Sequence, residues 1–436
     1  MNVRTSGGEE FERLIKPVAM VSRLVSIWPL DRDHSTVQEH LRVCHRILML
    51  LVSAGMSCFV TADVVRNSED LDTATECALI ASAFSLGFVR IVNYTVHRED
   101  MVYVVETMRK DWAEATPEDL LVLKEKCHVS FILAKQFIVT VLLALGMFML
   151  VPMLDIVILH YEERILPFRG YIFENQISSP HYEYLYVCTA LAGGLTGTTI
   201  ASATSFNLVS TMHGAARFAI LQKRLQALTT DDPECNAAMV DCVKRHQDAI
   251  KFADALERII NVLALGQFVI STGLVCCAGF QITSMVEDKG RLMKYCSFLN
   301  SAIFELFLFS ISGQQLIVES VAVGDSAFAA DWVGSSFSKS LRILMLRTTV
   351  PSKITAAKFY DMSLQSFTSV SLNHCGLKHT TFGVKNTIFF FFNSDSSDLT
   401  QTRSPDLSTC VDVDSAFFQV LSTSFSYFTV LQAMNE

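Results

Sequence analysis

Residues 133–159, LAKQFIVTVLLALGMFMLVPMLDIVIL, decide the fold class, because Lys135 and Asp155 are the only charged residues in this run. A helix that crosses the ~30 Å hydrocarbon core of a bilayer needs about 20 mostly apolar residues, and this run supplies them. The whole chain agrees: of its 436 residues, 50% are hydrophobic and 18% charged, and the mean hydropathy is +0.35. Such a composition predicts a protein whose solvent is a membrane.

Similar apolar runs recur along the chain. Together with 133–159 there are six: 43–63, 74–95, 133–159, 184–212, 258–284 and 296–323. A seventh, 420–434, is short for a crossing by itself and becomes long enough only when joined to a helix that we expect to begin at Tyr360. The sequence therefore predicts an all-α membrane protein with seven transmembrane helices.

Lysine and arginine in the connections predict the orientation. The amino-terminal segment and the second, fourth and sixth connections are rich in them, and the first, third and fifth are poorer. Since basic residues are retained on the cytoplasmic side, the amino terminus is expected in the cytoplasm. Two of the basic connections, 97–115 and 242–263, carry apolar residues at helical spacing beside a charged face, so we expect the membrane helices to extend into the cytoplasm as amphipathic helices.

Several classes of chemistry lack support. The net charge of −9 gives no basic footprint for nucleic acid. No spacing typical of a catalytic site occurs, so we expect no enzyme and no cofactor. His374, Cys375 and His379 lack a fourth ligand, so no metal site is expected. The 12 cysteines do not form a secreted disulfide framework, and pairing of Cys188 with Cys296 stays open.

Ionisable and small residues inside the runs each allow two interpretations. Glu305 lies in the middle of the run 296–323, where it serves either as a functional polar contact in a cavity or gate, or as a packing contact with Ser, Thr or Gln of a neighbouring helix. Asp155 is expected at the membrane interface. Small residues in the run 184–212 favour close helix packing over a ligand-facing surface; they are Gly193, Gly194, Gly197 and Ala201.

Aromatic and methionine side chains in the outer halves of the runs would suit an apolar ligand pocket. The candidate ligand-binding residues are Phe148, Met153, Tyr186, Phe280 and Phe304. Aromatic residues on membrane helices also commonly face lipid or a neighbouring helix, so the pattern leaves both roles open.

Several stretches resemble one family, the insect odorant receptors. They are CVKRHQDAIKFADALERII (242–260), SISGQQLIVESVAVGDSAFAADW (310–332), RILMLRTTVPSKITAAKFYDMSLQSF (342–367), LSTSFSYFTVLQAM (421–434) and, in the third connection, LPFRGYIFENQISSPHYEYLYV (166–187). The likeness covers most of the chain, is densest after Cys242, and is specific in its order rather than in any one motif.

The resemblance implies an odorant-tuned subunit in the plasma membrane of olfactory sensory neurons. It implies a tetrameric cation channel, assembled with a shared co-receptor subunit and opened by small volatile molecules. The ligand would bind among the second to sixth helices, and the last helix would line the pore. The pore-lining positions that this implies are Ser422, Ser424, Tyr427, Thr429 and Val430.

Three other classes compete with this interpretation. A gustatory-type receptor would share the fold, but the ending SFS and the approach DMSL favour the odorant branch. A G-protein-coupled receptor is opposed by the inside amino terminus and by the absence of its DRY-like and NPxxY-like sequences. A transporter would show repeats or broken spans in corresponding halves, which this chain lacks.

Residues 370–419 interrupt the seventh helix with an irregular, Ser- and Asp-bearing segment. We divide the chain into 1–369 (six helices and the lead-in to the seventh), the insert 370–419, and 420–436, the pore-lining end. Val370-Ser371 can be encoded as GTAAGT and Phe417-Phe418-Gln419 as TTTTTCCAG, the signals of a splice donor and acceptor. Our hypothesis is a retained in-frame intron; the alternative is a genuine long loop, which is uncommon inside one helix.

Overall fold

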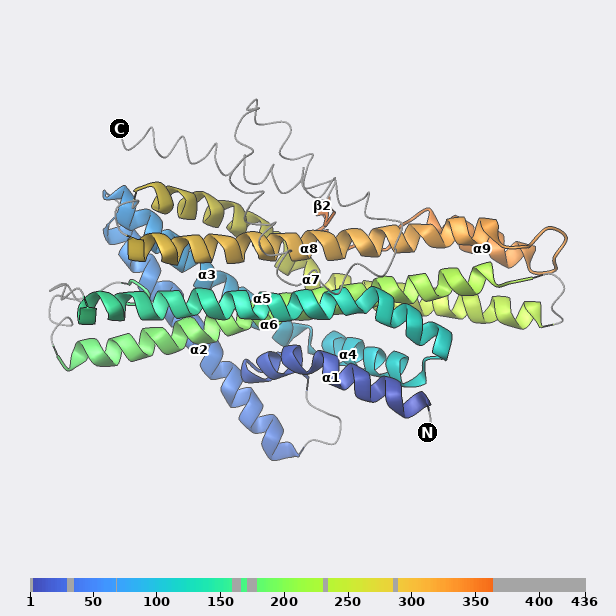
Figure 1. Cartoon of the computed structure of the whole chain (residues 1–436), viewed down its shortest axis with the longest axis horizontal. Coiled ribbons are helices and arrows are strands. Elements are labelled where there is room, and N and C mark those ends of the chain that lie inside the picture. The colour runs from blue at the N-terminus through green and yellow to red at the C-terminus, as the bar shows by residue number, and fades with distance from the viewer. Residues whose placement is uncertain are drawn as a thin grey trace, which may run out of the picture.

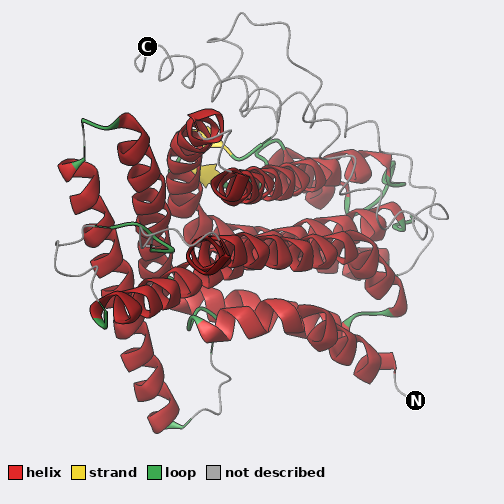
Figure 2. Cartoon of the chain, turned by 60° about the vertical axis from the view of Figure 1, so that its left-hand side comes forward, coloured by secondary structure: helices red, strands yellow, loops and turns green. Residues whose placement is uncertain are grey.

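The computed structural model describes residues 3–29, 35–67, 69–158, 166–170, 179–229, 234–284 and 289–363, and these are almost entirely helical (Figure 2). The helices are α1 (Val3–Leu24), α2 (Thr36–Arg66), α3 (Leu71–Val96), α4 (Arg98–Glu114), α5 (Pro117–Ile158), α6 (His181–Gln226), α7 (Cys235–Ser284), α8 (Lys289–Ala329) and α9 (Ser338–Thr348). Two short strands, β1 (Thr355–Ala356) and β2 (Tyr360–Asp361), follow. The predicted all-α class is confirmed.

The long helices α5, α6 and α8 run side by side along the long axis, and α6 contacts both of the others (Figure 1). With 46 residues, α6 is about 69 Å long, more than twice the ~30 Å core of a bilayer. Small buried residues such as Ala201, Ser202 and Ala203 let its neighbours approach closely. This helix therefore forms the centre of the bundle and continues well beyond any membrane it spans.

As far as the described residues extend, all six predicted apolar runs lie within helices. Among the described residues, α2, α3, α5, α6 and α8 are long and apolar enough to cross a membrane. The run 258–284 lies within α7, some of whose side chains lie outside the described part. The insert 370–419, the end 420–436 and the five pore-lining positions also lie outside the described residues.

The expected helix extensions are correct for one connection and wrong for the other. The stretch 242–263 belongs to the single helix α7. The stretch 97–115 forms a separate helix, because α3 ends at Val96 and the backbone of His97 leaves helical geometry (ψ 30°) before α4 begins. The apolar face of α4 then packs on α1 and α7, so this stripe is covered by the chain itself.

A helix at the amino terminus was not foreseen. Helix α1 lies against α4, α5 and α6. It buries Phe11, Ile15 and Val18, and the Phe11 ring lies 5.7 Å from the ring of Trp112 on α4. These contacts make α1 a part of the main core rather than a separate tail.

The expected start of a helix at Tyr360 is wrong. Tyr360 lies in β2, which pairs antiparallel with β1. Ala357 and Lys358 between the strands have positive φ values of 47° and 64°, which a continuous right-handed helix does not allow. The hairpin is tied to α7, because Glu257 accepts from the backbone N–H of Thr355 at 2.7 Å.

Two apolar cores divide the bundle along its length. The larger extends through α1, α4 and the central helices to α9. The smaller lies where α2 passes to α3 and is built from Val60, Cys77, Leu79, Ile80, Ala81, Phe84, Phe148, Phe168, Ala192 and Tyr295. We call this the α2–α3 end and the opposite one the α4–α9 end (Figure 1). Cys188 and Cys296, whose pairing the sequence left open, are free thiols.

Candidate functional site

Four aromatic rings meet in the smaller core at the α2–α3 end. Phe148 of α5 stacks on Phe168 with centroids 5.4 Å apart and planes 10° apart. Phe84 of α3 meets Phe168 edge-on at 5.8 Å, and Tyr295 of α8 meets Phe148 edge-on at 6.2 Å. Offset-stacked and edge-to-face pairs of this kind are favourable beyond their buried area. The result is an apolar, aromatic environment that three helices and one loop residue share.

The loop residue belongs to a segment that enters the bundle. Residues 166–170 precede α6, and Leu166 and Phe168 are buried although they lie outside any helix. Gly193 of α6 makes room for this, because a Cβ atom at Gly193 would overlap the Phe168 ring. The Gly-rich stretch of α6 thus accommodates the segment 166–170 as well as neighbouring helices.

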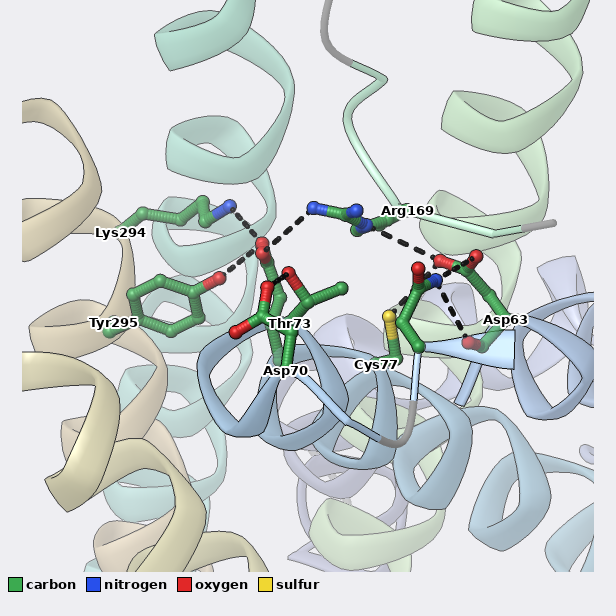
Figure 3. Close-up of polar contacts among 9 residues, drawn as sticks. Asp63, Asp70, Thr73, Cys77, Arg169, Lys294 and Tyr295 are labelled. Atoms are coloured by element: carbon green, nitrogen blue, oxygen red, sulfur yellow. Dashed lines mark hydrogen bonds and ion pairs between the residues drawn. The ribbon is translucent and has the colours of Figure 1, made fainter. Parts of the chain in front are cut away.

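A buried carboxylate lies beside these rings. Glu76 of α3 accepts a hydrogen bond from the hydroxyl of Tyr295 and pairs with the ammonium of Lys294 at 3.2 Å. The guanidinium of Arg169, from the segment 166–170, lies 3.9 Å from the other carboxylate oxygen. In Figure 3, Lys294 and Tyr295 approach from one side and Arg169 from the other.

Arg169 also contacts a second acid. Its Nε lies 3.3 Å from Asp63 at the end of α2. Asp63 accepts from the thiol of Cys77 at 3.2 Å and from the side-chain amide of Asn67 at 2.8 Å. We call Asp63, Glu76, Arg169 and Lys294 the Arg169 cluster. Its two acids and two cations balance, as buried charges must, since an unpaired one is costly.

A second buried cluster, the Arg90 cluster, joins α3, α6, α7 and α8. Arg90 and Glu305 form an ion pair at 2.6 Å with both side chains almost fully buried. Thr204 donates to Glu305 at 2.5 Å and Gln267 donates to it at 2.8 Å. The predicted contact of Glu305 with Thr or Gln of neighbouring helices is confirmed, and Arg90 adds the charge partner that the prediction lacked.

The five candidate ligand-binding residues lie in different surroundings. Phe148 is buried in the smaller core, and Tyr186 donates to the carbonyl of Met149 at 2.5 Å. Phe304 packs on the larger core, 5.8 Å from the ring of Phe137. Met153 is 51% exposed in the single chain, and the side chain of Phe280 lies outside the described residues, as does that of Asp155.

Most of the charged site residues were missed from the sequence. Arg90 was the lone cation inside the run 74–95, and Glu305 is one of two acids in the run 296–323. The cost of a charge in lipid shows that Arg90 needs an acidic partner, but not which acid it is. Lys294 precedes the run 296–323, which predicts a place in the fifth connection, but it lies within α8 and is 5% exposed. The residues around Phe168 in the sequence do not indicate that its side chain is buried in the bundle.

The α4–α9 end carries further ion pairs. Burial opposes ionisation of Asp111, but the His213 ring at 2.9 Å and Arg217 at 3.2 Å hold the pKa of this carboxyl below its usual range. Lys126 pairs with Glu319 at 2.7 Å, and Gln222 donates to the same carboxylate at 2.8 Å. Within the described residues, no group of His, Cys, Asp and Glu is arranged to hold a metal ion.

A family model, curated relatives and a solved structure are all similar to this chain, and all three are odorant or olfactory receptors. The family model described as 7tm Odorant receptor matches residues 70–373. Odorant receptor 13a of Drosophila melanogaster is 23% identical over 80% of this chain and 90% of its own length, and Odorant receptor 82a of the same species is 21% identical over 78% and 91%. The insect olfactory receptor OR5 from Machilis hrabei, solved with eugenol, superimposes with a TM-score of 0.74 over 88% of this chain and 98% of its own, at 15% identity.

Proposed function

Since the chain belongs to the insect odorant receptor family, a family of multi-pass membrane proteins, we propose that it is an odorant-tuned subunit of an odorant-gated cation channel, assembled with a shared co-receptor subunit of the same fold. The plasma membrane of olfactory sensory neurons is its proposed location. The observation that carries the proposal is the family match over residues 70–373, which covers most of the described bundle. The fold shared with an olfactory receptor supports it.

The α4–α9 end is proposed to face the cytoplasm. It carries α1, α4 and α9, together with the basic connections that predicted this orientation. The α2–α3 end then faces outward, where volatile molecules arrive. A tag at the amino terminus should be inaccessible to antibody in unpermeabilised cells; a tag that is stained there would favour a G-protein-coupled receptor instead.

The odorant is proposed to bind at the smaller core. Phe148, one of the candidate ligand residues, lies there among three other rings beside the carboxylate of Glu76. Mostly apolar walls with a few placed polar groups are typical of small-molecule sites. An odorant opens the channel only to the extent that it binds the open arrangement more tightly than the closed one. Met153, Tyr186, Phe280 and Phe304 stay candidates for the same ligand.

The channel is proposed to need an uninterrupted last helix. Its pore-lining residues would be Ser422, Ser424, Tyr427, Thr429 and Val430, and the insert 370–419 precedes them. The family match ends at residue 373, close to the start of this insert, which supports a retained intron. If the insert is translated, it must lie outside the bilayer, since its unpaired backbone groups would be costly in lipid.

The proposal is tested by recording odorant-evoked current after co-expression with a co-receptor subunit. Two forms are compared: the sequence as given and a version that lacks 370–419. We expect current from the shortened form and its loss in the full one, because the insert displaces the pore helix. Absence of current in both forms, over a broad odorant panel, contradicts the channel. Sequencing transcripts across Ser369 and Val420 tests the intron, and an insert present in the dominant mRNA contradicts it.

A further inference from the structure

The ammonium of Lys294 is surrounded by Glu76, Phe148 and Tyr295, which we call the cage. It lies 3.2 Å from the carboxylate of Glu76, 5.0 Å from the centroid of the Phe148 ring and 4.7 Å from that of Tyr295. Lys294 is 5% exposed, so water contributes little to its solvation. The charge is therefore stabilised by the acid and by two aromatic faces.

This arrangement is the one that proteins use to bind ammonium ligands. A cation within about 6 Å of a ring centroid is attracted by the quadrupole of the ring, and the effect is strongest where water is excluded. A carboxylate adds full charge, and here it is fixed in place because the Tyr295 hydroxyl donates to it. With the amine removed, Glu76 would still have the guanidinium of Arg169 at 3.9 Å and that hydrogen bond among its partners.

A lysine at this position fills the cage from within. Beyond its Cβ atom, a lysine side chain is a propylammonium ion: three carbons and the charged nitrogen. Because it is attached to α8, its effective concentration at Glu76 far exceeds that of any free amine. We propose that Glu76, Phe148 and Tyr295 form a binding site for primary ammonium groups, that Lys294 is its built-in occupant, and that Lys294 thereby makes the receptor insensitive to amine odorants.

A second lysine–glutamate pair provides a matched control. Lys126 and Glu319 lie 2.7 Å apart, and the side chain of Glu319 is as buried as that of Glu76, at 9% exposure. Within the described residues, no aromatic ring lies over the Lys126 ammonium. The side chain of Lys126 is 34% exposed. The two pairs share the ionic contact and differ in the cage.

The test is chemical rescue of the purified chain in detergent. Lys294→Ala removes the propylammonium, and n-propylamine hydrochloride, protonated at neutral pH as lysine is, returns it. We expect the unfolding temperature of the variant to rise with amine concentration, by about 2 °C once the amine is roughly tenfold above its Kd. The wild type, Lys126→Ala and the double variant Glu76→Gln/Lys294→Ala should stay within error, and 1-propanol should not replace the amine.

Each outcome either supports or overturns the proposed ammonium site. An equal shift in Lys126→Ala or in the double variant would mean that the amine acts without the cage, and no shift in Lys294→Ala would mean that the cage does not bind amines; both overturn the proposal. If Lys294→Ala does not fold by itself, the readout becomes the yield of folded protein from cells grown with and without n-propylamine, and an unchanged yield overturns it.

The effect on odorant selectivity rests on the proposed function, whereas binding to the cage does not. Co-expressed with the co-receptor, Lys294→Ala is expected to gain current evoked by n-propylamine, whereas the wild type gives none. A shift in unfolding temperature with no current for any odorant would contradict the proposed channel and leave the ammonium site standing. Current with neutral odorants and none with the amine would overturn the role of Lys294 in selectivity.

Discussion

In the Arg90 cluster every polar group comes from a long helix, whereas in the Arg169 cluster one of the two cations comes from the non-helical segment 166–170. Both clusters balance their charges, but Arg90 and Glu305 are both buried, whereas Arg169 is 41% exposed. They differ in what must move to open them. Separating Arg90 from Glu305 requires α3 and α8 to move apart, but Arg169 can leave its acids when a few loop residues shift.

This difference indicates separate roles. A charge pair held by four helices resists any rearrangement that does not shift whole helices, so the Arg90 cluster is suited to fixing the packing of the bundle. The Arg169 cluster ties the α2–α3 end through a non-helical segment instead of a long helix, which suits the end where we propose that the odorant binds.

Breaking the Arg90 cluster should have the largest effect. Arg90→Met or Glu305→Met leaves the opposite charge buried and unpaired, which costs about 3–5 kcal/mol, whereas the double variant should recover most of that loss. The measurement is the unfolding temperature of purified protein and a double-mutant cycle. Arg98→Met is the control, because its pair with Glu39 is about 40% exposed and is worth under ~1 kcal/mol. A double variant as unstable as the sum of the single ones would rule out the coupling.

Filling the space that Phe168 uses should have the next largest effect. In Gly193→Ala the new methyl overlaps the Phe168 ring, so the segment 166–170 has to shift, at a cost of about 1–3 kcal/mol. Gly194→Ala is the matched control on the same helix, because its methyl would lie 3.6 Å from Met149, at ordinary contact distance. Similar unfolding temperatures for the two variants would show that the segment does not depend on Gly193.

The fold was predictable where long apolar runs recur along the sequence. The six apolar runs each carry many residues that favour a membrane helix, so errors at single positions do not matter. The prediction that a helix begins at Tyr360 was wrong. The conformation of that segment is determined by a contact between residues distant in sequence, Glu257 and Thr355, and by two residues with positive φ. Local apolar spacing does not contain this information.

The site was predictable only in part, for a similar reason. Phe148, predicted to bind ligand, is buried in the smaller core, and its role in binding stays a prediction. The predicted polar partners of Glu305 on neighbouring helices are confirmed. The partners themselves come from distant parts of the chain: Arg90 for Glu305, and Lys294 for Glu76. Neither cation stood out in the sequence, since Lys294 lies in the fifth connection between two apolar runs. A sequence shows that charges must be balanced in a membrane, but only the packing shows which ones meet.

Removing Arg169 should destabilise the chain less, by about 1 kcal/mol, because its side chain is 41% exposed and both acids keep other partners. Its main effect should be local opening. Cys77, which is fully buried and donates to Asp63, is expected to react several-fold faster with an alkylating reagent in Arg169→Ala, measured by mass spectrometry of its peptide. Arg98→Ala should leave this rate unchanged. An unchanged rate in Arg169→Ala as well would mean that the segment does not close the α2–α3 end.

The smallest expected effect concerns a buried basic group that is neutral instead of paired. His246 of α7 lies outside the apolar run 258–284; burial, and then the charge of Arg347, lower its pKa to about 4. Because the unfolded chain takes up this proton first, at its ordinary pKa of about 6.5, the contribution of His246 to stability is complete above that pH and decreases as the pH falls toward 4.

The loss should be under ~1 kcal/mol at about pH 6. Comparing unfolding temperatures at about pH 7.5 and pH 6 in wild type and His246→Gln measures it, and the variant should lose part of the pH dependence. His40→Gln, at an exposed position, should keep it. Unlike Arg90, which is paired with Glu305, His246 can be buried by giving up its proton. If His246→Gln and wild type show the same pH dependence, His246 is not buried by losing its proton. Ion pairing, as between Arg90 and Glu305, would then be the way in which the described bundle stabilises its buried basic groups.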